Sequence, residues 1–302
     1  MSCPSCNSAN LIKGECYREY TLYKCGACGL QFWTPLKHPG KEFYETSELH
    51  RIEGKKGLEW RHEQFIKNPP LRSGTLLDVA CGTGEFLNAA KEKGFDVWGI
   101  DLSERQIKAA KEFHGLEHVY AEALDTFVER KDIPRFDVIT FFEVLEHVDN
   151  PRAFFDFLKR IITPDGIIVF SVPNTRRIGM GKEPEETPPN HLLRWDRDSI
   201  SNFLRIEGFV HEKIVEQPFS KPFFFTTGLF SFGLVKRVSQ AKGPLSQNSA
   251  GISRKNSPLT CVIKRVANAK NKILLPVAAF LAFFPRALGL KYWDMYVVAR
   301  LK

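Results

Sequence analysis

The sequence predicts an α/β protein built on a doubly wound, mostly parallel sheet of seven strands, with a small zinc ribbon before it. Three observations predict this class. Strand-like and helical runs alternate from about residue 58, as in consecutive βαβ units. An apolar run at 75–80 leads into a turn that holds Gly82 and Gly84. Two Cys-x-x-Cys pairs lie before residue 30. We divide the chain into a ribbon (1–40), an α/β domain (41–217 and 294–302) and an insertion (218–293).

The ribbon is predicted from its cysteines, Cys3, Cys6, Cys25 and Cys28, whose two pairs are separated by 18 residues. Two such pairs give tetrahedral thiolate coordination of Zn²⁺, and because sulfur fills all four positions the ion is expected to be structural. A module of this size buries too little core to fold alone, and a structural zinc contributes about 10–16 kcal/mol. A pair of disulfides is the alternative, but it needs an oxidising compartment. No signal-peptide pattern opens the chain, so we expect a cytoplasmic location.

The strands of the sheet are expected in βαβ order, with an antiparallel pair at the end. Helix start signals between them support the assignment: Ser103 with Gln106 forms a predicted capping box, and Asn150 precedes Pro151 at the first helical position. The predicted strands are 75–80, 95–100, 117–120, 136–142, 166–172, 209–216 and 294–301.

The glycine-rich turn predicts a nucleoside site. Small residues after Asp78 let the backbone approach a ligand closely, and Asp101 ends the next strand 19 residues after Gly82, where a carboxylate can bond both ribose hydroxyls. A dinucleotide is the competing hypothesis, but Leu87 stands where its third glycine would be. Asp78 within the turn would repel a pyrophosphate, so the pattern favours a cationic cofactor such as a sulfonium amino acid.

Four segments together resemble the motifs of class I S-adenosylmethionine-dependent methyltransferases. They are 78–84 (DVACGTG), 99–103 (GIDLS), 136–139 (FDVI) and 143–148 (EVLEHV). The resemblance covers about 58–216 and the last strand, and it departs from the family at Ala80, where glycine is frequent. It implies that Glu122 and Ala123 flank the adenine and that Phe141 to Glu143 line the methionine end. A solvated loop carboxylate is the alternative for Glu122. The cofactor residues so implied are Asp78, Ala80, Cys81, Gly82, Gly84, Asp101, Leu102, Glu122, Ala123, Phe142 and Glu143.

Methyl transfer needs an aligned nucleophile and a base, and two histidines follow carboxyl ends of predicted strands: His147 and His191. We expect one of them to act as the base. The chain is also similar to ubiquinone-pathway O-methyltransferases, and that resemblance implies a Mg²⁺ or related ion held by Glu143, Glu146 and His147. Alternatively, Glu143 positions the cofactor and Glu146-His147 begins a helix.

The net charge of +8 comes from the insertion, where twelve Lys/Arg and no acidic residue lie between Pro218 and Trp293. The apolar run at 273–285 is 13 residues long, short of the about 20 that span a bilayer. We therefore predict that the insertion lies on an anionic membrane at its inner face. A cap over the substrate, over the sheet or over a second subunit is one alternative, and RNA binding is another.

These patterns together predict methylation, expected on oxygen, of a small-molecule acceptor: a sugar, a glycan precursor, a quinone or a lipid-linked compound. The arrangement is similar to that of methyltransferases of bacterial glycan and natural-product pathways. An RNA methyltransferase and a cofactor-binding protein without catalysis are the two competing hypotheses. The sequence makes no prediction about oligomeric state.

Overall fold

The computed structural model describes residues 1–40, 42–43, 57–177, 186–218 and 291–302. The chain divides into two compact units, one of residues 1–217 with 293–302 and the other of residues 218–292. The apolar run at 273–285 and most of the basic residues of the predicted insertion lie outside the described residues. Within the described residues, no helix is long and apolar enough to cross a membrane.

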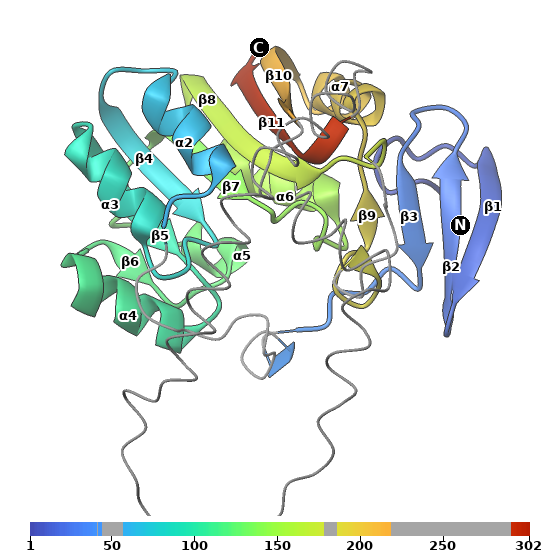
Figure 1. Cartoon of the computed structure of the whole chain (residues 1–302), viewed down its shortest axis with the longest axis horizontal. Coiled ribbons are helices and arrows are strands. Elements are labelled where there is room, and N and C mark those ends of the chain that lie inside the picture. Colours follow the sequence, from blue (N-terminus) through green and yellow to red (C-terminus); the bar gives the residue numbers. More distant parts are fainter. Residues whose placement is uncertain (41, 44–56, 178–185, 219–290) are drawn as a thin grey trace, which may run out of the picture. The chain divides into compact units, whose positions relative to one another are not determined.

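The larger sheet has seven strands in the order β10-β11-β8-β7-β4-β5-β6, which confirms the predicted fold class (Figure 1). Neighbouring strands from β8 to β6 pair in parallel, and β11 pairs antiparallel with β8. Strand β8 starts at Ile162, four residues before its predicted start at Gly166. The strands are β4 (Gly74–Val79), β5 (Phe95–Ile100), β6 (Val119–Tyr120), β7 (Phe136–Phe142), β8 (Ile162–Pro173), β10 (Phe209–Pro218) and β11 (Lys291–Leu301).

Helices cover both faces of this sheet. Phe65, Phe86 and Ile107 pack with Leu76 on one face, and they come from α2 (Trp60–Lys67), α3 (Glu85–Glu92) and α4 (Glu104–His114). The opposite face is covered by α5 (Leu124–Phe127), α6 (Pro151–Ile161) and α7 (Arg197–Ile206). Apolar side chains alternate between the two faces along each buried strand, so both faces need a helical layer.

Two of these helices start where the sequence predicts. The Asn150 side chain accepts a hydrogen bond from the Ala153 amide at 3.1 Å, with Pro151 at the first helical position of α6. The Ser103 hydroxyl accepts from the Gln106 amide at 3.3 Å, which is one half of the predicted capping box of α4. These caps satisfy amides that the helices leave without an internal acceptor.

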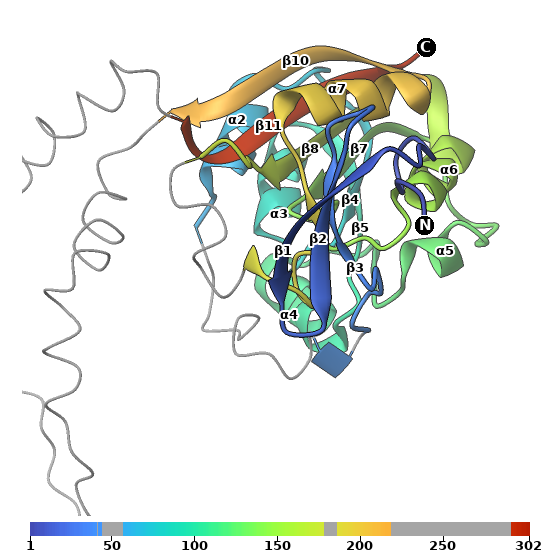
Figure 2. The same ribbon diagram turned by 90° about the vertical axis from the view of Figure 1, so that its right-hand side faces the viewer.

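The N-terminal sheet has the order β1-β2-β3-β9, and its last strand comes from a distant part of the chain. Strands β1 (Leu11–Tyr17), β2 (Tyr20–Cys25) and β3 (Gln31–Thr34) belong to the ribbon, whereas β9 (Leu193–Arg194) lies between β8 and α7. Phe32 pairs with Leu193 across the β3–β9 edge, and Figure 1 shows β9 beside β3. Figure 2 shows β1, β2 and β3 side by side. The ribbon sheet is therefore completed by the α/β part of the chain.

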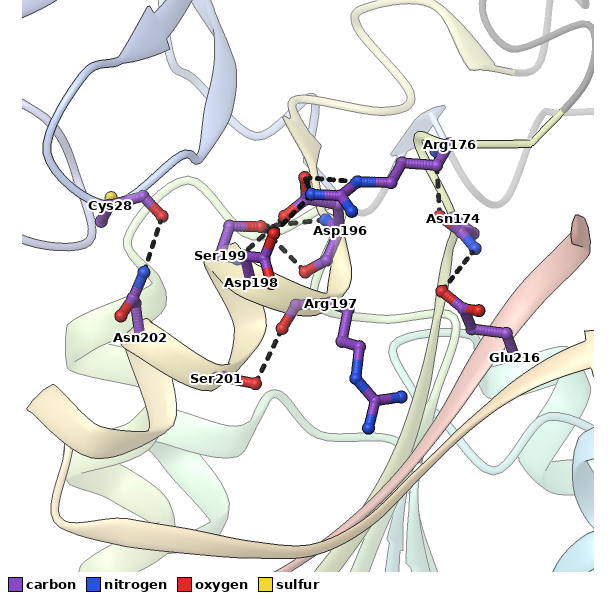
Figure 3. Close-up of polar contacts among 10 residues, drawn as sticks. All are labelled: Cys28, Asn174, Arg176, Asp196, Arg197, Asp198, Ser199, Ser201, Asn202 and Glu216. Atoms are coloured by element: carbon purple, nitrogen blue, oxygen red, sulfur yellow. Dashed lines mark hydrogen bonds and ion pairs between the residues drawn. The ribbon is translucent and has the colours of Figure 1, made fainter.

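Side chains reinforce this connection. The Arg194 guanidinium lies 4.9 Å above the Trp33 ring and donates to Glu15 at 3.0 Å. In Figure 3 the amide of Asn202, on α7, points to the backbone carbonyl of Cys28, at a distance of 3.3 Å. Trp33 itself is 1% exposed and belongs to the same apolar core as the residues of α6 and α7. The ribbon and the large sheet thus share one core.

Candidate functional site

A cavity of about 340 Å³ opens at the carboxyl ends of β4, β5 and β7, where ligands bind in open α/β sheets. Its walls come from the turn after β4, the end of β5, the segment after β7 and the start of α2. The lining residues are His38, Gly57, Glu59, Arg61, His62, Asp78, Ala80, Cys81, Gly82, Thr83, Glu85, Phe86, Asp101, Leu102, Ser103, Gln106, Phe142, Glu143, Val144 and His147.

The turn after β4 is shaped by positive φ angles, which are 63° at Ala80, 57° at Gly82 and 83° at Gly84. A Cβ at Gly84 would lie 2.6 Å from Leu116 Cδ1 and 3.1 Å from Ala110 Cβ, so any other residue would require its neighbours to shift. Ala80 accepts the left-handed conformation at a cost of about 1–2 kcal/mol. This tight turn lets the backbone at Ala80, Cys81 and Gly82 line the cavity, as close approach to a nucleoside requires.

Asp101 is held at the end of β5 by two backbone amides. Its Oδ2 accepts from Gly82 N at 3.0 Å and its Oδ1 accepts from Ser103 N at 2.8 Å. Burial raises the pKa of Asp101 above its ordinary value, although the two amides lower it. Each carboxylate oxygen retains a second lone pair, so the group can also accept from two hydroxyls of a ribose.

Asp78 is a buried carboxylate beneath the same turn. Its Oδ1 accepts from the Thr140 hydroxyl at 2.6 Å, and its exposed fraction is 4%. Burial raises the pKa of Asp78 to about 7; the Thr140 hydroxyl lowers it, and Asp101 raises it. A cation in the cavity would stabilise the ionised form of this group.

Arg61 and His62, at the start of α2, line the cavity although no sequence pattern indicated them. Arg61 donates to Asp294 Oδ2 at 3.1 Å. Burial first, and then the charge of Arg61, lower the pKa of His62 to about 3, so its ring is neutral. The ring of His62 packs on Phe86 and Phe142, with centroids 5.4 and 5.1 Å away. This wall therefore offers a guanidinium beside an aromatic surface.

Of the cofactor residues implied by the resemblance, eight line the cavity: Asp78, Ala80, Cys81, Gly82, Asp101, Leu102, Phe142 and Glu143. Gly84 lies in the same turn and begins α3. Glu122 and Ala123 are outside the lining: Glu122 accepts from Arg130 at 2.9 Å, and Ala123 is the N-cap of α5. The cavity lining also includes residues that the sequence did not indicate, which besides Arg61 and His62 are Phe86, Ser103, Gln106 and Val144. Helix caps and apolar positions of this kind carry no sequence signal of ligand binding.

The two candidate bases lie together. The rings of His147 and His191 are nearly perpendicular, with centroids 4.7 Å apart, and His147 lines the cavity. The Nδ1 atom of His147 is 2.8 Å from the Asn190 carbonyl oxygen, and the Nδ1 atom of His191 is 3.6 Å from Glu186. Segments 43 residues apart thus bring the two imidazoles into contact, and of the two only His147 is in the cavity lining.

The three residues implied to hold Mg²⁺ do not converge as expected. Glu143 accepts from the Ser171 hydroxyl at 2.8 Å and lines the cofactor cavity. Glu146 and His147 instead gather with His191, so that one ligand atom from each lies within 4.8 Å of the others. Burial first, and then the charge of Glu143, raise the pKa of Glu146 well above its ordinary value.

The four ribbon cysteines also gather, with their sulfur atoms within 4.8 Å of one another. Sulfur to sulfur distances are 3.6 Å for Cys3 with Cys28 and 3.5 Å for Cys6 with Cys25, and all four thiols are free. A tetrahedron with Zn–S bonds of about 2.3 Å has sulfur atoms about 3.8 Å apart, so the arrangement fits Zn²⁺. Disulfide bonds are absent among these four.

Comparison with known proteins gives a consistent family. A family model described as a methyltransferase domain matches residues 50–215. The chain is 33% identical over 157 residues to a ubiquinone biosynthesis O-methyltransferase of Bordetella avium, a match that covers 51% of this chain and 60% of that protein. It is 29% identical over 196 residues to the protein of the same name from Leptothrix cholodnii, covering 57% and 81%.

The chain therefore spans less than two thirds of the length of the Bordetella relative. Among solved structures, a SAM-dependent methyltransferase from Archaeoglobus fulgidus superposes with a TM-score of 0.46 at 18% identity, over 79% of this chain and 92% of that one.

Proposed function

Since this chain belongs to the methyltransferase-domain family, we propose that it transfers a methyl group from S-adenosylmethionine to an oxygen atom of a small-molecule acceptor. The observation that carries the proposal is the cavity in which Asp101 ends β5 and Asp78 lies beneath the turn after β4. The carboxylate of Asp101 can accept hydrogen bonds from the ribose hydroxyls of S-adenosylmethionine, and that of Asp78 can stabilise the cationic end of the same cofactor.

The residues around the cavity divide the work of holding the cofactor. Asp101 accepts from the ribose hydroxyls, and the turn from Ala80 to Gly84 lets the nucleoside approach the backbone. Arg61 lines the cavity and suits the carboxylate at the amino acid end of the cofactor, because a guanidinium can donate two parallel hydrogen bonds to a carboxylate. When bound, the cofactor supplies the methyl group on an activated sulfonium.

The acceptor oxygen must then lose a proton as it is methylated. His147 lies at the cavity wall and serves as the base, with its tautomer set by the Asn190 carbonyl. His191 packs against it and provides the alternative base. Because the leaving group is already activated, alignment and one base are sufficient for the reaction.

Candidate acceptors are a quinone, a sugar, a glycan precursor or a lipid-linked compound. Two relatives are named ubiquinone biosynthesis O-methyltransferase, which supports a hydroxyl on a quinone-type ring as the first acceptor to assay. We propose that the enzyme acts in the cytoplasm at the inner face of the membrane, held by the basic insertion. We further propose that the four ribbon cysteines hold one structural Zn²⁺, because their spacing fits a tetrahedral sulfur site.

The cofactor site is tested with Asp101→Asn, measured by calorimetric titration with S-adenosylmethionine. Loss of the charged acceptor for two hydroxyls should weaken binding by about 10- to 150-fold, since a hydrogen bond to a charged group contributes about 1.5–3 kcal/mol. Asp96→Asn is the matched control, because Asp96 lies on the same strand with an exposed side chain. Equal affinities of the two variants would contradict the assignment.

The transfer itself is tested with S-adenosylmethionine labelled in its methyl group. A catechol-type quinone precursor, nucleotide sugars, lipid extract and total RNA are offered separately. Label in a small molecule or lipid supports the proposal, with the His147→Ala variant losing turnover but keeping cofactor affinity. Label confined to RNA, or none in any fraction, would refute it.

A further inference from the structure

We propose that Glu146, His147 and His191 form a second metal site, of two imidazoles and one carboxylate, that takes a first-row transition ion such as Mn²⁺ or Fe²⁺. The site differs from the one implied by resemblance, because His191 replaces Glu143 and the ion differs from Mg²⁺. It goes beyond methyl transfer, since metal binding can be measured without an acceptor. An ion held by His147 and His191 occupies the lone pairs that a base needs, so the base role proposed for either histidine applies to the protein without this ion.

The three side chains converge from distant parts of the chain. Glu146 and His147 follow β7, while His191 lies just before β9, yet a ligand atom of each lies within 4.8 Å of the other two. The Nε2 atom of His147 is 3.9 Å from Glu146 Oε1. These separations are somewhat wider than in a bound site, so an ion would draw the three side chains together.

Glu146 is buried without a hydrogen-bond donor. Its exposed fraction is 0%, and neither carboxylate oxygen has a hydrogen-bond partner among the residues that the structure describes. Its backbone carbonyl accepts from the Leu192 and Leu193 amides, at 2.8 and 3.0 Å, which ties this position to the segment that carries His191. A buried carboxylate with no donors is costly, and a coordinated cation removes that cost.

Each of the two histidines directs its Nδ1 atom at an oxygen outside the cluster. His147 Nδ1 lies 2.8 Å from the Asn190 carbonyl, so an N–H there donates to it and the lone pair falls on Nε2. His191 Nδ1 faces Glu186, whose other carboxylate oxygen is 2.7 Å from the Arg177 guanidinium. Metal-binding histidines characteristically direct their second nitrogen at a carbonyl or a carboxylate in this way.

Glu186 is suited to this orienting role. Its side chain is buried between the Arg177 guanidinium, at 2.7 Å, and the Nδ1 atom of His191, at 3.6 Å. A carboxylate in this position can orient the His191 ring, as carboxylates beside metal-binding histidines do.

The segment that carries His191 is also anchored at both ends. Thr175 N donates to the Trp195 carbonyl at 2.9 Å. Arg176 binds both Asp196 and Asp198 at the start of α7, and Figure 3 shows its guanidinium between the two carboxylates. Anchored ends hold His191 opposite Glu146 before any ion binds, and such preorganisation favours binding.

The ligand types select the ion. Mg²⁺ takes oxygen ligands with near-ideal octahedral geometry, whereas imidazole suits transition metals. Two histidines and one carboxylate form the set used by non-haem iron sites, and Mn²⁺ binds similar sets. Glu143 is engaged with Ser171 in the cofactor cavity and does not complete the cluster.

The test is a titration of the full-length protein, holding one equivalent of Zn²⁺, with MnCl₂, followed by the paramagnetic resonance signal of free Mn²⁺. One equivalent of zinc fills the thiolate site, which binds it more tightly, so Mn²⁺ reports on the second site. We expect one Mn²⁺ per chain, which Mg²⁺ at about tenfold excess does not displace. Absence of binding, or full displacement by that Mg²⁺, would overturn the proposal.

Variants distinguish the two ligand sets. His191→Ala and Glu146→Gln each remove a ligand and should weaken Mn²⁺ binding by at least about tenfold. Glu186→Gln leaves all three ligands in place and should weaken Mn²⁺ binding by about tenfold, because it removes the carboxylate that orients His191. His211→Ala, an exposed histidine on β10, is the matched control and should bind normally. Glu143→Gln should also retain the ion. Loss of binding in Glu143→Gln with retention in His191→Ala would refute the assignment.

Discussion

The affinity for S-adenosylmethionine should depend on pH through Asp78. In the protein without cofactor, burial, with a smaller effect of Asp101, raises the pKa of this carboxylate from 3.8 to about 7. A cationic cofactor in the cavity favours the ionised form and lowers that pKa. Binding therefore releases a proton whenever the pH is below about 7, and affinity falls as the pH falls.

The magnitude follows from the size of the shift. A return from about 7 to 3.8 corresponds to about 4 kcal/mol of interaction between the cofactor and the ionised carboxylate, as an upper limit. Affinity should then fall by up to about tenfold at pH 6 and about 100-fold at pH 5, relative to its plateau above pH 7.

The assay is calorimetric titration from pH 5 to 8 in buffers of different ionisation enthalpy, which also counts the protons released. The α-amino group of the cofactor titrates near pH 8, so the reference is the same series with Asp78→Asn. Asparagine can still accept from the Thr140 hydroxyl. An affinity that is constant from pH 5 to 7 in the natural protein, or an equal dependence in Asp78→Asn, would refute the reasoning.

The same shift has a consequence for stability without cofactor. Because the folded-state pKa is raised, the native protein binds this proton more tightly than the unfolded chain does. The contribution of Asp78 to the free energy of unfolding is full below pH 3.8 and is lost as the pH rises to about 7. Asp78→Asn should accordingly be more stable than the natural protein at pH 8.

Two further predictions concern stability. Gly84→Ala should lower the free energy of unfolding by about 1–3 kcal/mol in urea titrations, because the positive φ and a Cβ 2.6 Å from Leu116 Cδ1 both destabilise the folded variant. Gly115→Ala, whose Cβ would meet nothing within 4 Å, tests the positive φ alone and should lose about 1–2 kcal/mol. Equal losses in the two variants would contradict the steric effect at Gly84. Cys28→Ser should remove the zinc that metal analysis measures, and it should lower the melting temperature of the whole unit because the ribbon shares its core with α7. Cys16→Ser, at an exposed position, is the control and should change neither quantity. An unchanged melting temperature of the natural protein after treatment with a chelator would contradict the zinc site.

The cofactor cavity was largely predictable because its signals are short-range. The residues from Asp78 to Gly84 form one strand end and one turn, and Asp101 ends the adjacent strand, so parallel pairing alone brings them together. Arg61 and His62 were not predictable in this way. They precede the turn on a helix with no characteristic spacing, and they reach the cavity only because α2 packs its Phe65 face on the sheet.

The metal-binding hypothesis shows the same limit at longer range. The resemblance to ubiquinone-pathway O-methyltransferases grouped Glu143, Glu146 and His147, which are neighbours in the chain. The backbone at Glu143 has a φ of 54°, and its side chain bonds Ser171, whereas Glu146 is buried opposite His191. Neighbours in a sharp turn point in different directions, and a spacing rule cannot show which of them converge.

The amino-acid sequence by itself determined the class of fold, the seven strands in their order along the chain, the two cysteine pairs and the turn with its two carboxylates. Each depends on local periodicity or on residues a few positions apart. Only the tertiary structure decided that Leu193–Arg194 completes the ribbon sheet and that His191 meets Glu146 and His147. A two-residue strand has no periodicity, and contacts between distant segments form because the shared core packs them together, so neither could be seen in the sequence.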